Sequence, residues 1–419
     1  MHLNLNKLFG TIVLVIFFTG QTLVTSACQK QEKSNDIIHQ TDNPITTDPN
    51  TVVTAQQWNK DVVGWNLGNQ LECTPPGFES ESFDLRNPDN ADQAETGWGN
   101  PVVTRRVIKA IKAAGFNAVR VPVRWQCHIT NAKAMSISPT WLARVKEIVD
   151  WCLAEDLKVI INVHHDKWLE GRATNLYKEE NCQKLALLWA NIAMAFRKYD
   201  YRVAFAGTNE VHIRDNWERP TDENLAVQNA YNQTFVDVVR ATGGNNEKRH
   251  LLVQTYACNP YYGIDGAFIV PNDLDENGNS YMSIEFHFYN PWTYAGGTTY
   301  YYWGAPYKQW GACPEDEHQM TDLFDKAVLQ WSAKGLGVCI GEWGISNHYK
   351  TDEVERIHQN MTYYCQYYVK QTRLRGFSTF YWDNNYQGNG EEKFGVFDRN
   401  KGMKVVAPWI IEGITRGRK

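Results

Sequence analysis

The chain has 419 residues, of which 43% are hydrophobic and 21% charged, and its formal net charge is −5. This composition suits a folded protein with a sizeable core, and the absence of a basic block argues against a nucleic-acid partner. The length leaves room for one large α/β barrel or for two ordinary domains.

The N-terminus has the pattern of an export signal. Lys7 supplies a positive charge, residues 8–23 are largely apolar, and residues 25–27 are small and precede Cys28. Small residues directly before a Cys are typical of bacterial lipoprotein processing, so we expect a lipid anchor on Cys28 and a place at the cell surface or outer membrane. The alternative is ordinary cleavage, with release to the periplasm or the medium.

From residue 62 onward, short apolar runs alternate with longer amphipathic segments. Runs that are apolar throughout, rather than at every second residue, suit parallel strands that are buried on both faces. We expect eight such strands, at residues 62–65, 118–123, 159–163, 203–207, 251–254, 283–286, 337–340 and 377–381.

Helical patterns fall between these runs, at residues 104–114, 139–157, 179–199, 224–242, 320–334, 353–375 and 405–414. Gly115 is a good stop signal for the first of them. This alternation of strand and helix predicts an α/β fold, a (β/α)8 TIM barrel with right-handed crossovers. We expect a signal peptide at residues 1–28, a polar linker at 29–50 and a single barrel domain at 51–419.

Eight cysteines remain when Cys28 is set aside. Their wide scatter and the absence of a CxxC pair argue against a metal site, and we expect neither a metal nor another cofactor. An exported protein could pair some of them as disulfides. Because Cys152 and Cys365 fall in helical patterns and Cys339 in a strand, buried free thiols are the alternative.

Polar residues gather at the C-terminal ends of the expected strands, where the active sites of this fold lie. They are Asn66, Asn69 and Glu72 after the first run, Arg120 in the second, His164, His165 and Asp166 after the third, Asn209 and Glu210 after the fourth, His287 and Tyr289 after the sixth, Glu342 after the seventh, and Trp382 and Asp383 after the eighth. A lone histidine in such a place is commonly structural, but polar or aromatic groups at seven strand ends indicate a site.

Glu210 and Glu342 are the two carboxylates that stand at strand tips in apolar contexts. The fourth and seventh strands of an eight-stranded barrel face each other across its mouth. Two facing carboxylates with Arg and His donors nearby suit cleavage of a glycosidic bond, and we expect the retaining spacing of about 5–5.5 Å between them. We also expect the negative charge of Glu342 to raise the pKa of Glu210. A salt bridge at the rim would explain either glutamate alone, but it explains the pair poorly.

Seven motifs in this chain resemble glycoside hydrolase family 5 and follow the order of that family. They are residues 64–69 (GWNLGN), 115–125 (GFNAVRVPVRW), 161–165 (INVHH), 209–210 (NE), 287–292 (HFYNPW), 341–344 (GEWG) and 381–383 (YWD). Residues 95–101 (ETGWGNP), together with the HFYNPW motif, resemble the subfamily that cuts β-1,4-glucan backbones. One departure is Val211-His212, where the family usually has Pro after Asn-Glu.

The resemblance implies a role for each matching position. Glu210 corresponds to the acid/base, Glu342 to the nucleophile and Asn209 to the residue that bonds the sugar 2-hydroxyl. Arg120 corresponds to the arginine that supports the nucleophile. The other expected substrate-binding residues are Asn69, Glu72, His164, His165, His287, Tyr289, Trp292 and Trp382.

The sequence therefore predicts a monomeric retaining endo-glycosidase that cleaves internal β-1,4 bonds of cellulose, xyloglucan or mixed-linkage glucan. The alternatives are a β-mannanase with the same mechanism and a non-catalytic, glycan-binding surface lipoprotein. Residues 288–316, after the sixth strand, carry many aromatic residues between glycines. We expect Trp292 and Trp303 in this loop to contact the polysaccharide, and the alternative, above all for Trp303, is that these rings pack the loop onto the barrel.

Overall fold

The computed structural model describes residues 51–75, 91–264, 266–275 and 277–419. They belong to one compact unit that spans residues 43–419. The expected signal peptide, the lipid-anchor Cys28 and the expected linker at 29–50 all lie outside the described residues. None of the described helices combines the length and the apolar character that a membrane crossing requires.

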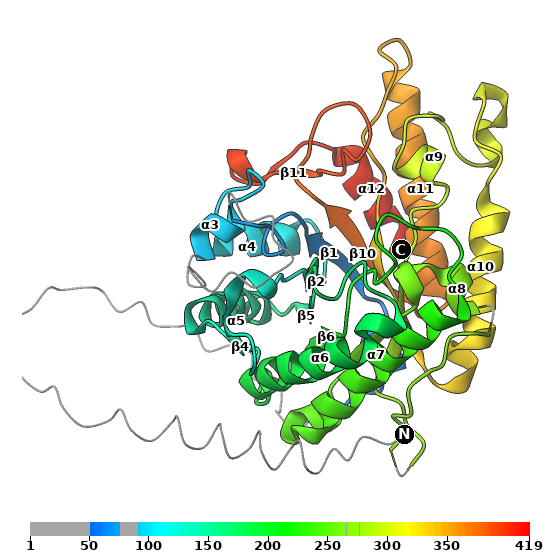
Figure 1. Ribbon diagram of the computed structural model, residues 1–419. Coiled ribbons are helices and arrows are strands. Elements are labelled where there is room, and N and C mark those ends of the chain that lie inside the picture. The colour runs from blue at the N-terminus through cyan, green and yellow to red at the C-terminus, as the bar shows by residue number, and fades with distance from the viewer. Residues whose placement is uncertain (1–50, 76–90, 265, 276) are drawn as a thin grey trace, which may run out of the picture. The chain divides into compact units, whose positions relative to one another are not determined.

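Eight parallel strands close into a barrel, as the sequence predicts (Figure 1). They are β1 (Val63–Leu67), β2 (Ala118–Val121), β5 (Lys158–Asn162), β6 (Val203–Ala206), β7 (Leu251–Gln254), β8 (Met282–His287), β9 (Gly337–Trp343) and β10 (Ser378–Asp383). Pairing of β1 with both β2 and β10 completes the closure. Almost every strand residue is buried, which explains why the runs are apolar throughout.

The seven predicted helices are all present, with their ends shifted by a few residues. They are α4 (Arg105–Ala113), α5 (Pro139–Ala154), α6 (Asn175–Phe196), α7 (Asp222–Ala241), α10 (Glu317–Gln330), α11 (Val354–Leu374) and α12 (Pro408–Gly417). Local chemistry sets several starts: the Ser138 side chain caps α5 with Pro139 in its first turn, and Thr221 and Asp316 form capping boxes on α7 and α10.

The segment after β7 departs from the regular alternation, because only the short η3 (Tyr256–Cys258) and α8 (Pro260–Ile264) follow that strand. Other short elements had no periodic signal long enough to be predicted. They are α2 (Ala55–Asn59), α3 (Ala91–Glu95), α9 (Trp292–Ala295), η4 (Ala305–Trp310), the hairpin of β3 (Ile129–Asn131) and β4 (Ser136–Ile137), and the hairpin of β11 (Phe397–Asp398) and β12 (Lys404–Val405).

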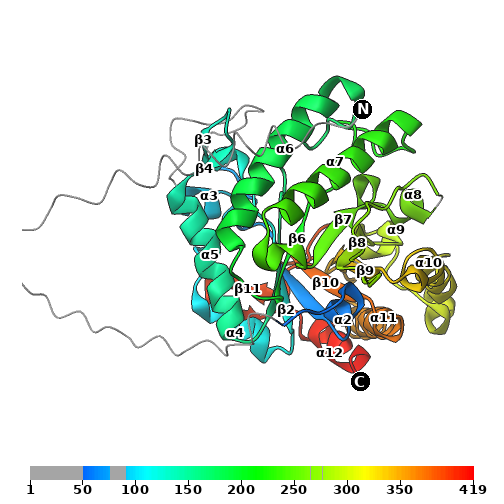
Figure 2. The same ribbon diagram turned by 90° about the horizontal axis from the view of Figure 1, so that it is seen from below.

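Helix α2 packs against β8 and β9 ahead of the first strand (Figure 2). Trp58 of α2 is fully buried in a core cluster that includes Ala204, Leu252 and Phe380 from three barrel strands. Asn59 donates to Ser283 Oγ at 2.6 Å and accepts from Ser378 Oγ at 2.5 Å. These contacts lie at the first residues of the strands, so α2 covers that end of the barrel and the opposite end carries the polar side chains.

Three of the cysteines are buried thiols in regular elements: Cys152 in α5, Cys339 in β9 and Cys365 in α11. None of these three forms a disulfide. Burial raises the pKa of each thiol, which keeps it protonated and poorly reactive. The free-thiol alternative is therefore the correct one for these positions.

Candidate active site

Glu210 and Glu342 meet at the C-terminal end of the barrel. Glu210 follows β6 and its side chain is 24% exposed, while Glu342 lies near the end of β9 with 7% exposure. One carboxylate oxygen of each, together with a ring nitrogen of His287, form a group in which all atoms lie within 4.8 Å of one another. The two carboxylates therefore lie close enough for one bound molecule to contact both of them.

Arg120 of β2 lies directly beneath this pair and is fully buried. Its Nη1 donates to Glu342 Oε1 at 2.8 Å and to Asn66 Oδ1 at 3.0 Å, and its Nη2 donates to Asn209 Oδ1 at 2.8 Å. Arg120 thus holds Glu342 and Asn209 in fixed positions relative to each other, which is the supporting role expected for it.

Glu285 is a buried carboxylate of β8 that the sequence interpretation missed. Its Oε1 lies 3.1 Å from Arg120 Nε as an ion pair, and its Oε2 accepts from Gln254 Nε2 at 3.0 Å. Burial raises the pKa of Glu285, but the charge of Arg120 and the contact with His287 outweigh burial and lower it. A charged residue inside a run expected to be buried on both faces was the signal that could have revealed it.

Gly341 allows Glu285 to lie at this position. A Cβ atom on Gly341 would lie 2.0 Å from Glu285 Oε1, and this is far inside contact distance. The Gly341 carbonyl also accepts from Asn66 Nδ2 at 2.9 Å. The glycine that precedes Glu342 therefore belongs to the packing of the buried charges.

His287 and Tyr289 both contact the glutamate pair, as expected. His287 Nδ1 lies 2.5 Å from Glu210 Oε1 and 3.6 Å from Glu342 Oε2, and the Tyr289 hydroxyl donates to Glu342 Oε2 at 3.1 Å. Burial lowers the pKa of His287, but the negative charges that face it raise that pKa well above its ordinary value. Burial and both glutamates raise the pKa of Tyr289, so its hydroxyl remains a donor.

The prediction that the pKa of Glu210 lies above its ordinary value is wrong. Burial raises the pKa of Glu210, but the charge and hydrogen bond of His287 outweigh it and lower that pKa below its ordinary value. The sequence argument considered only the repulsion from Glu342 and could not place an imidazole at hydrogen-bond distance. The protonation of Glu210 therefore depends on the charge of His287.

His164 and Trp382 lie parallel to each other at the rim, with ring centroids 6.0 Å apart and an angle of 7° between the planes. His164 Nδ1 lies 3.0 Å from Asn162 Nδ2, and Nε2 lies 3.4 Å from Asn209 Nδ2. Burial and neighbouring cations lower the pKa of His164 well below its ordinary value, so the ring is neutral. Trp382 is partly exposed and offers an aromatic face beside Asn209.

His165 is the more exposed member of the histidine pair, with 29% of its side chain accessible. Its Nδ1 lies 3.0 Å from Glu170 Oε1. Burial lowers the pKa of His165, but Glu170 outweighs burial and raises it. His165 is thus available at the rim, close to the partly exposed Trp98, whose ring centroid lies 6.0 Å away.

Asn69 and Glu72 have different positions, although both were expected to bind substrate. Asn69 is partly exposed in a left-handed turn with φ of 55°. Glu72 is fully buried, and its carboxylate accepts from the backbone N–H groups of Asn69 and Gln70. The prediction that Glu72 contacts the substrate is therefore wrong, because its side chain is buried. Glu72 instead fixes the turn that presents Asn69.

The two tryptophans of the long loop also differ. Trp292 begins α9 and is 49% exposed, with its ring 5.9 Å from that of Tyr289. Trp303 is fully buried and packs against Tyr364 and Tyr367. The expected polysaccharide contact of Trp303 is therefore wrong, because a sequence pattern does not show which ring of an aromatic loop turns inward.

The turn after Glu210 is formed without the usual proline. Val211 is buried and its carbonyl accepts from Ala257 N at 3.0 Å. His212 Nδ1 lies 2.6 Å from the Glu210 carbonyl oxygen, and its ring stacks on Trp217 with centroids 4.0 Å apart. Side-chain contacts of His212 thus shape the turn that proline would otherwise constrain.

The group of Glu210, His287 and Glu342 has the side-chain types and spacing of a possible metal site among the described residues. Their chemistry fits metal binding poorly, however. Arg120 and Tyr289 already donate to the two oxygens of Glu342, and the guanidinium of Arg120 is a positive charge that would repel a metal cation at this position. The arrangement suits two carboxylates that act on a bound molecule directly.

Comparison with known proteins agrees with this geometry. The model of the cellulase family (glycosyl hydrolase family 5) matches residues 78–388. Endoglucanase B of Clostridium cellulovorans is 33% identical over 371 residues, which cover 87% of this chain and 76% of that protein. The solved structure of a Bacteroides ovatus family 5 xyloglucanase with a heptasaccharide matches with a TM-score of 0.76 and 30% identity, over 90% of this chain and 80% of that one. A family 5 lichenase from Caldicellulosiruptor matches with a TM-score of 0.75 and 30% identity, over 90% of this chain and 98% of that one.

The ion pair of Arg120 and Glu285 generates a stability prediction. Glu285→Gln removes the negative charge but keeps the volume, so the buried guanidinium loses one of its two ion-pair partners. We expect the free energy of unfolding to fall by about 3–5 kcal/mol. Glu155→Gln, which breaks the exposed pair with Arg105 at 3.3 Å, is the control and should cost at most about 1 kcal/mol. Denaturant midpoints of the three proteins measure both effects, and equal midpoints for the two variants would contradict the assigned role of Glu285.

Proposed function

This chain belongs to glycoside hydrolase family 5, and we propose that it cleaves internal β-1,4 bonds of a plant cell-wall glucan by double displacement. Its membership and its relatives make it a glycoside hydrolase of the endo-β-1,4-glucanase kind. The observation that carries the mechanism is the close approach of Glu210 and Glu342, since one carboxylate oxygen of each lies within 4.8 Å of the other.

In the first step, a carboxylate oxygen of Glu342 attacks the anomeric carbon of the bound sugar. The bond from that carbon to the glycosidic oxygen breaks, and Glu210 gives its proton to the departing oxygen. Arg120 and Tyr289 orient Glu342 for this attack through hydrogen bonds of 2.8 and 3.1 Å. The product of the step is a covalent glycosyl ester on Glu342 and a free chain end.

In the second step, the Glu210 carboxylate takes a proton from a water molecule. The oxygen of that water bonds to the anomeric carbon, and the ester bond to Glu342 breaks. Two successive inversions at the same carbon leave its configuration retained. Asn209 has its Oδ1 held by Arg120 at 2.8 Å, so its Nδ2 is oriented to donate to the sugar 2-hydroxyl.

The proposal that the substrate is a glucan is supported by the relatives, which are an endoglucanase, a xyloglucanase and a lichenase. The aromatic faces of Trp382 and Trp292 suit the C–H faces of a β-linked chain, and His165 and Asn69 supply polar groups at the same rim. An assay for new reducing ends on cellulose, xyloglucan, mixed-linkage glucan and mannan tests this. We expect glucan cleavage, and activity confined to mannan would contradict the proposal.

The roles of the two glutamates can be separated with azide. Glu210→Ala should retain glycosylation of substrates with good leaving groups, and added azide should restore turnover as a β-glycosyl azide. Glu342→Ala lacks the nucleophile, so azide should restore no activity with retained configuration. Product analysis by proton NMR distinguishes the outcomes, and the reverse pattern would mean that the roles are exchanged.

The pH dependence should reveal the influence of His287 on Glu210. Activity needs protonated Glu210, so it falls as the pH rises through the pKa of Glu210. His287→Asn removes the cation that lowers this pKa. We expect the alkaline limb of kcat/KM to move upward.

Exposed His318→Asn on α10 is the matched control and should leave the profile in place. An alkaline limb that stays fixed or moves downward in His287→Asn would contradict the coupling between His287 and Glu210.

We also propose that the protein is exported, anchored through a lipid on Cys28 and active as a monomer. The N-terminal pattern up to Cys28 supports the anchor. Because Glu210, Glu342 and Arg120 all come from one chain, the site needs no second copy. Metabolic labelling with palmitate should mark the parent protein and fail with Cys28→Ala, and equal labelling of both would overturn the anchor.

A further inference from the structure

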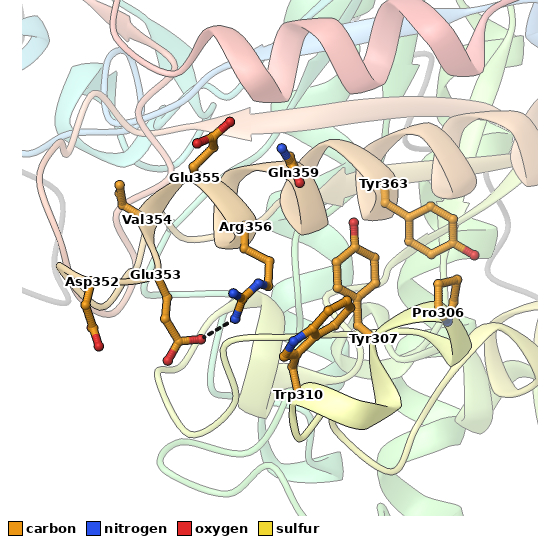
Figure 3. Close-up of a pocket in the computed structure, with 10 residues that line it drawn as sticks. All are labelled: Pro306, Tyr307, Trp310, Asp352, Glu353, Val354, Glu355, Arg356, Gln359 and Tyr363. Carbon is orange, nitrogen blue, oxygen red and sulfur yellow. Dashed lines mark hydrogen bonds and ion pairs between the residues drawn. The ribbon is translucent and has the colours of Figure 1, made fainter.

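A second concave site lies between η4 and the first turns of α11 (Figure 3). The cavity has a volume of about 820 Å³. Tyr307 and Trp310 come from η4, while Glu355, Gln359 and Tyr363 come from α11. Glu210, Glu342 and His287 are not among the residues that line this cavity.

One wall of the cavity is aromatic. The rings of Tyr307 and Trp310 lie 5.5 Å apart, and Tyr307 lies 5.9 Å from Tyr363. Trp310 is 39% exposed. The exposed Trp310 ring, next to Tyr307 of the same short helix, leaves apolar area open to water, which is typical of a surface that binds a ligand.

Ring contacts and hydrogen bonds hold the aromatic wall in place. Tyr302 stacks on Tyr307, with centroids 6.0 Å apart and an angle of 12°, and its hydroxyl donates to Glu353. The Tyr363 hydroxyl donates to Glu317 Oε1 at 2.6 Å, and the same carboxylate accepts from the N–H of Ala305 at the start of η4. The wall is therefore formed before any ligand arrives, which lowers the entropic cost of binding.

The opposite side of the cavity offers hydrogen-bonding groups. Glu355 and Gln359 are exposed on α11, and neither side chain has a hydrogen-bond partner among the described residues. Arg356 lies over the Trp310 ring at 5.1 Å and bonds to Glu353 at 3.3 Å, which orients the indole. The carboxylate of Glu355 and the amide of Gln359 belong to the lining of the cavity and can bond sugar hydroxyls, while the rings can contact sugar C–H faces.

We propose that this cavity is an accessory binding site for a β-linked glucan segment, outside the catalytic cleft. The inference rests on the proposed function, because a polymeric substrate can reach both sites at once. Binding at a second site on the same chain raises the effective concentration of the polymer at the catalytic group. The accessory site therefore acts on long substrates and has no effect on short ones.

Trp310→Ala removes the most exposed ring of the wall. We expect KM for soluble polymeric glucan to rise about fivefold to tenfold, as the lost apolar contact implies, while hydrolysis of an aryl cellobioside is unchanged. Leu374→Ala, at the other end of α11 and 69% exposed, is the matched control and should change neither. Unchanged polymer kinetics in a folded Trp310→Ala protein would overturn the proposal, as would equal losses on both substrates.

A binding measurement separates this inference from the catalytic proposal. In the inactive Glu342→Ala background, titration calorimetry with cellohexaose should give two sites per chain, and Trp310→Ala should remove one of them. A single site in both proteins overturns the accessory site, whereas two sites in a parent that cleaves no glucan would contradict the proposed function alone. If Trp310→Ala lowers the melting temperature, the double variant Glu355→Ala/Gln359→Ala replaces it, because both side chains are exposed, and retention of both sites there would overturn the proposal.

Discussion

One buried cation, the guanidinium of Arg120, sets the tightest constraint on this barrel. A charge removed from water is tolerated only when partners surround it. Here the partners are Asn66 of β1, Asn209 after β6, Glu285 of β8 and Glu342 of β9. A slip of any of these strands by one residue would turn its partner to the other face and leave the charge short of a contact. The register of the barrel and the geometry of the catalytic group are thus fixed by the same interaction.

The regular part of the fold could be predicted because each element carries a physical signature of its burial. Strands enclosed on both faces are apolar throughout, and helices that cover them show one apolar stripe, so all eight strands and seven helices were predicted. The segment after β7 was different, because α8 (Pro260–Ile264) has a single turn and no stripe. Helix α2 was missed for the same reason, although Trp58 makes it part of the core.

The sequence predicted which residues stand at the strand ends that form the site. It did not predict the direction in which each side chain points. Glu285 was counted as part of an apolar run, yet its ion pair with Arg120 completes the buried network. Glu72 points into the protein and Trp303 packs beneath its loop, and neither direction can be seen in a linear pattern. The pKa of Glu210 depends on a 2.5 Å contact with His287, and such a contact exists only after folding.

The rim of the barrel carries several non-glycine residues in the left-handed region of backbone space. Asn69, His165, Glu210, Cys258 and Asn385 all have φ between 45° and 61°, at a cost of order 1 kcal/mol or more each. In evolutionary terms, the rim is a place where stability has been given up for the placement of side chains. Glycine at these positions would relieve the strain but remove the group that the turn presents. Substitutions that raise stability and keep these side chains must therefore lie away from the rim.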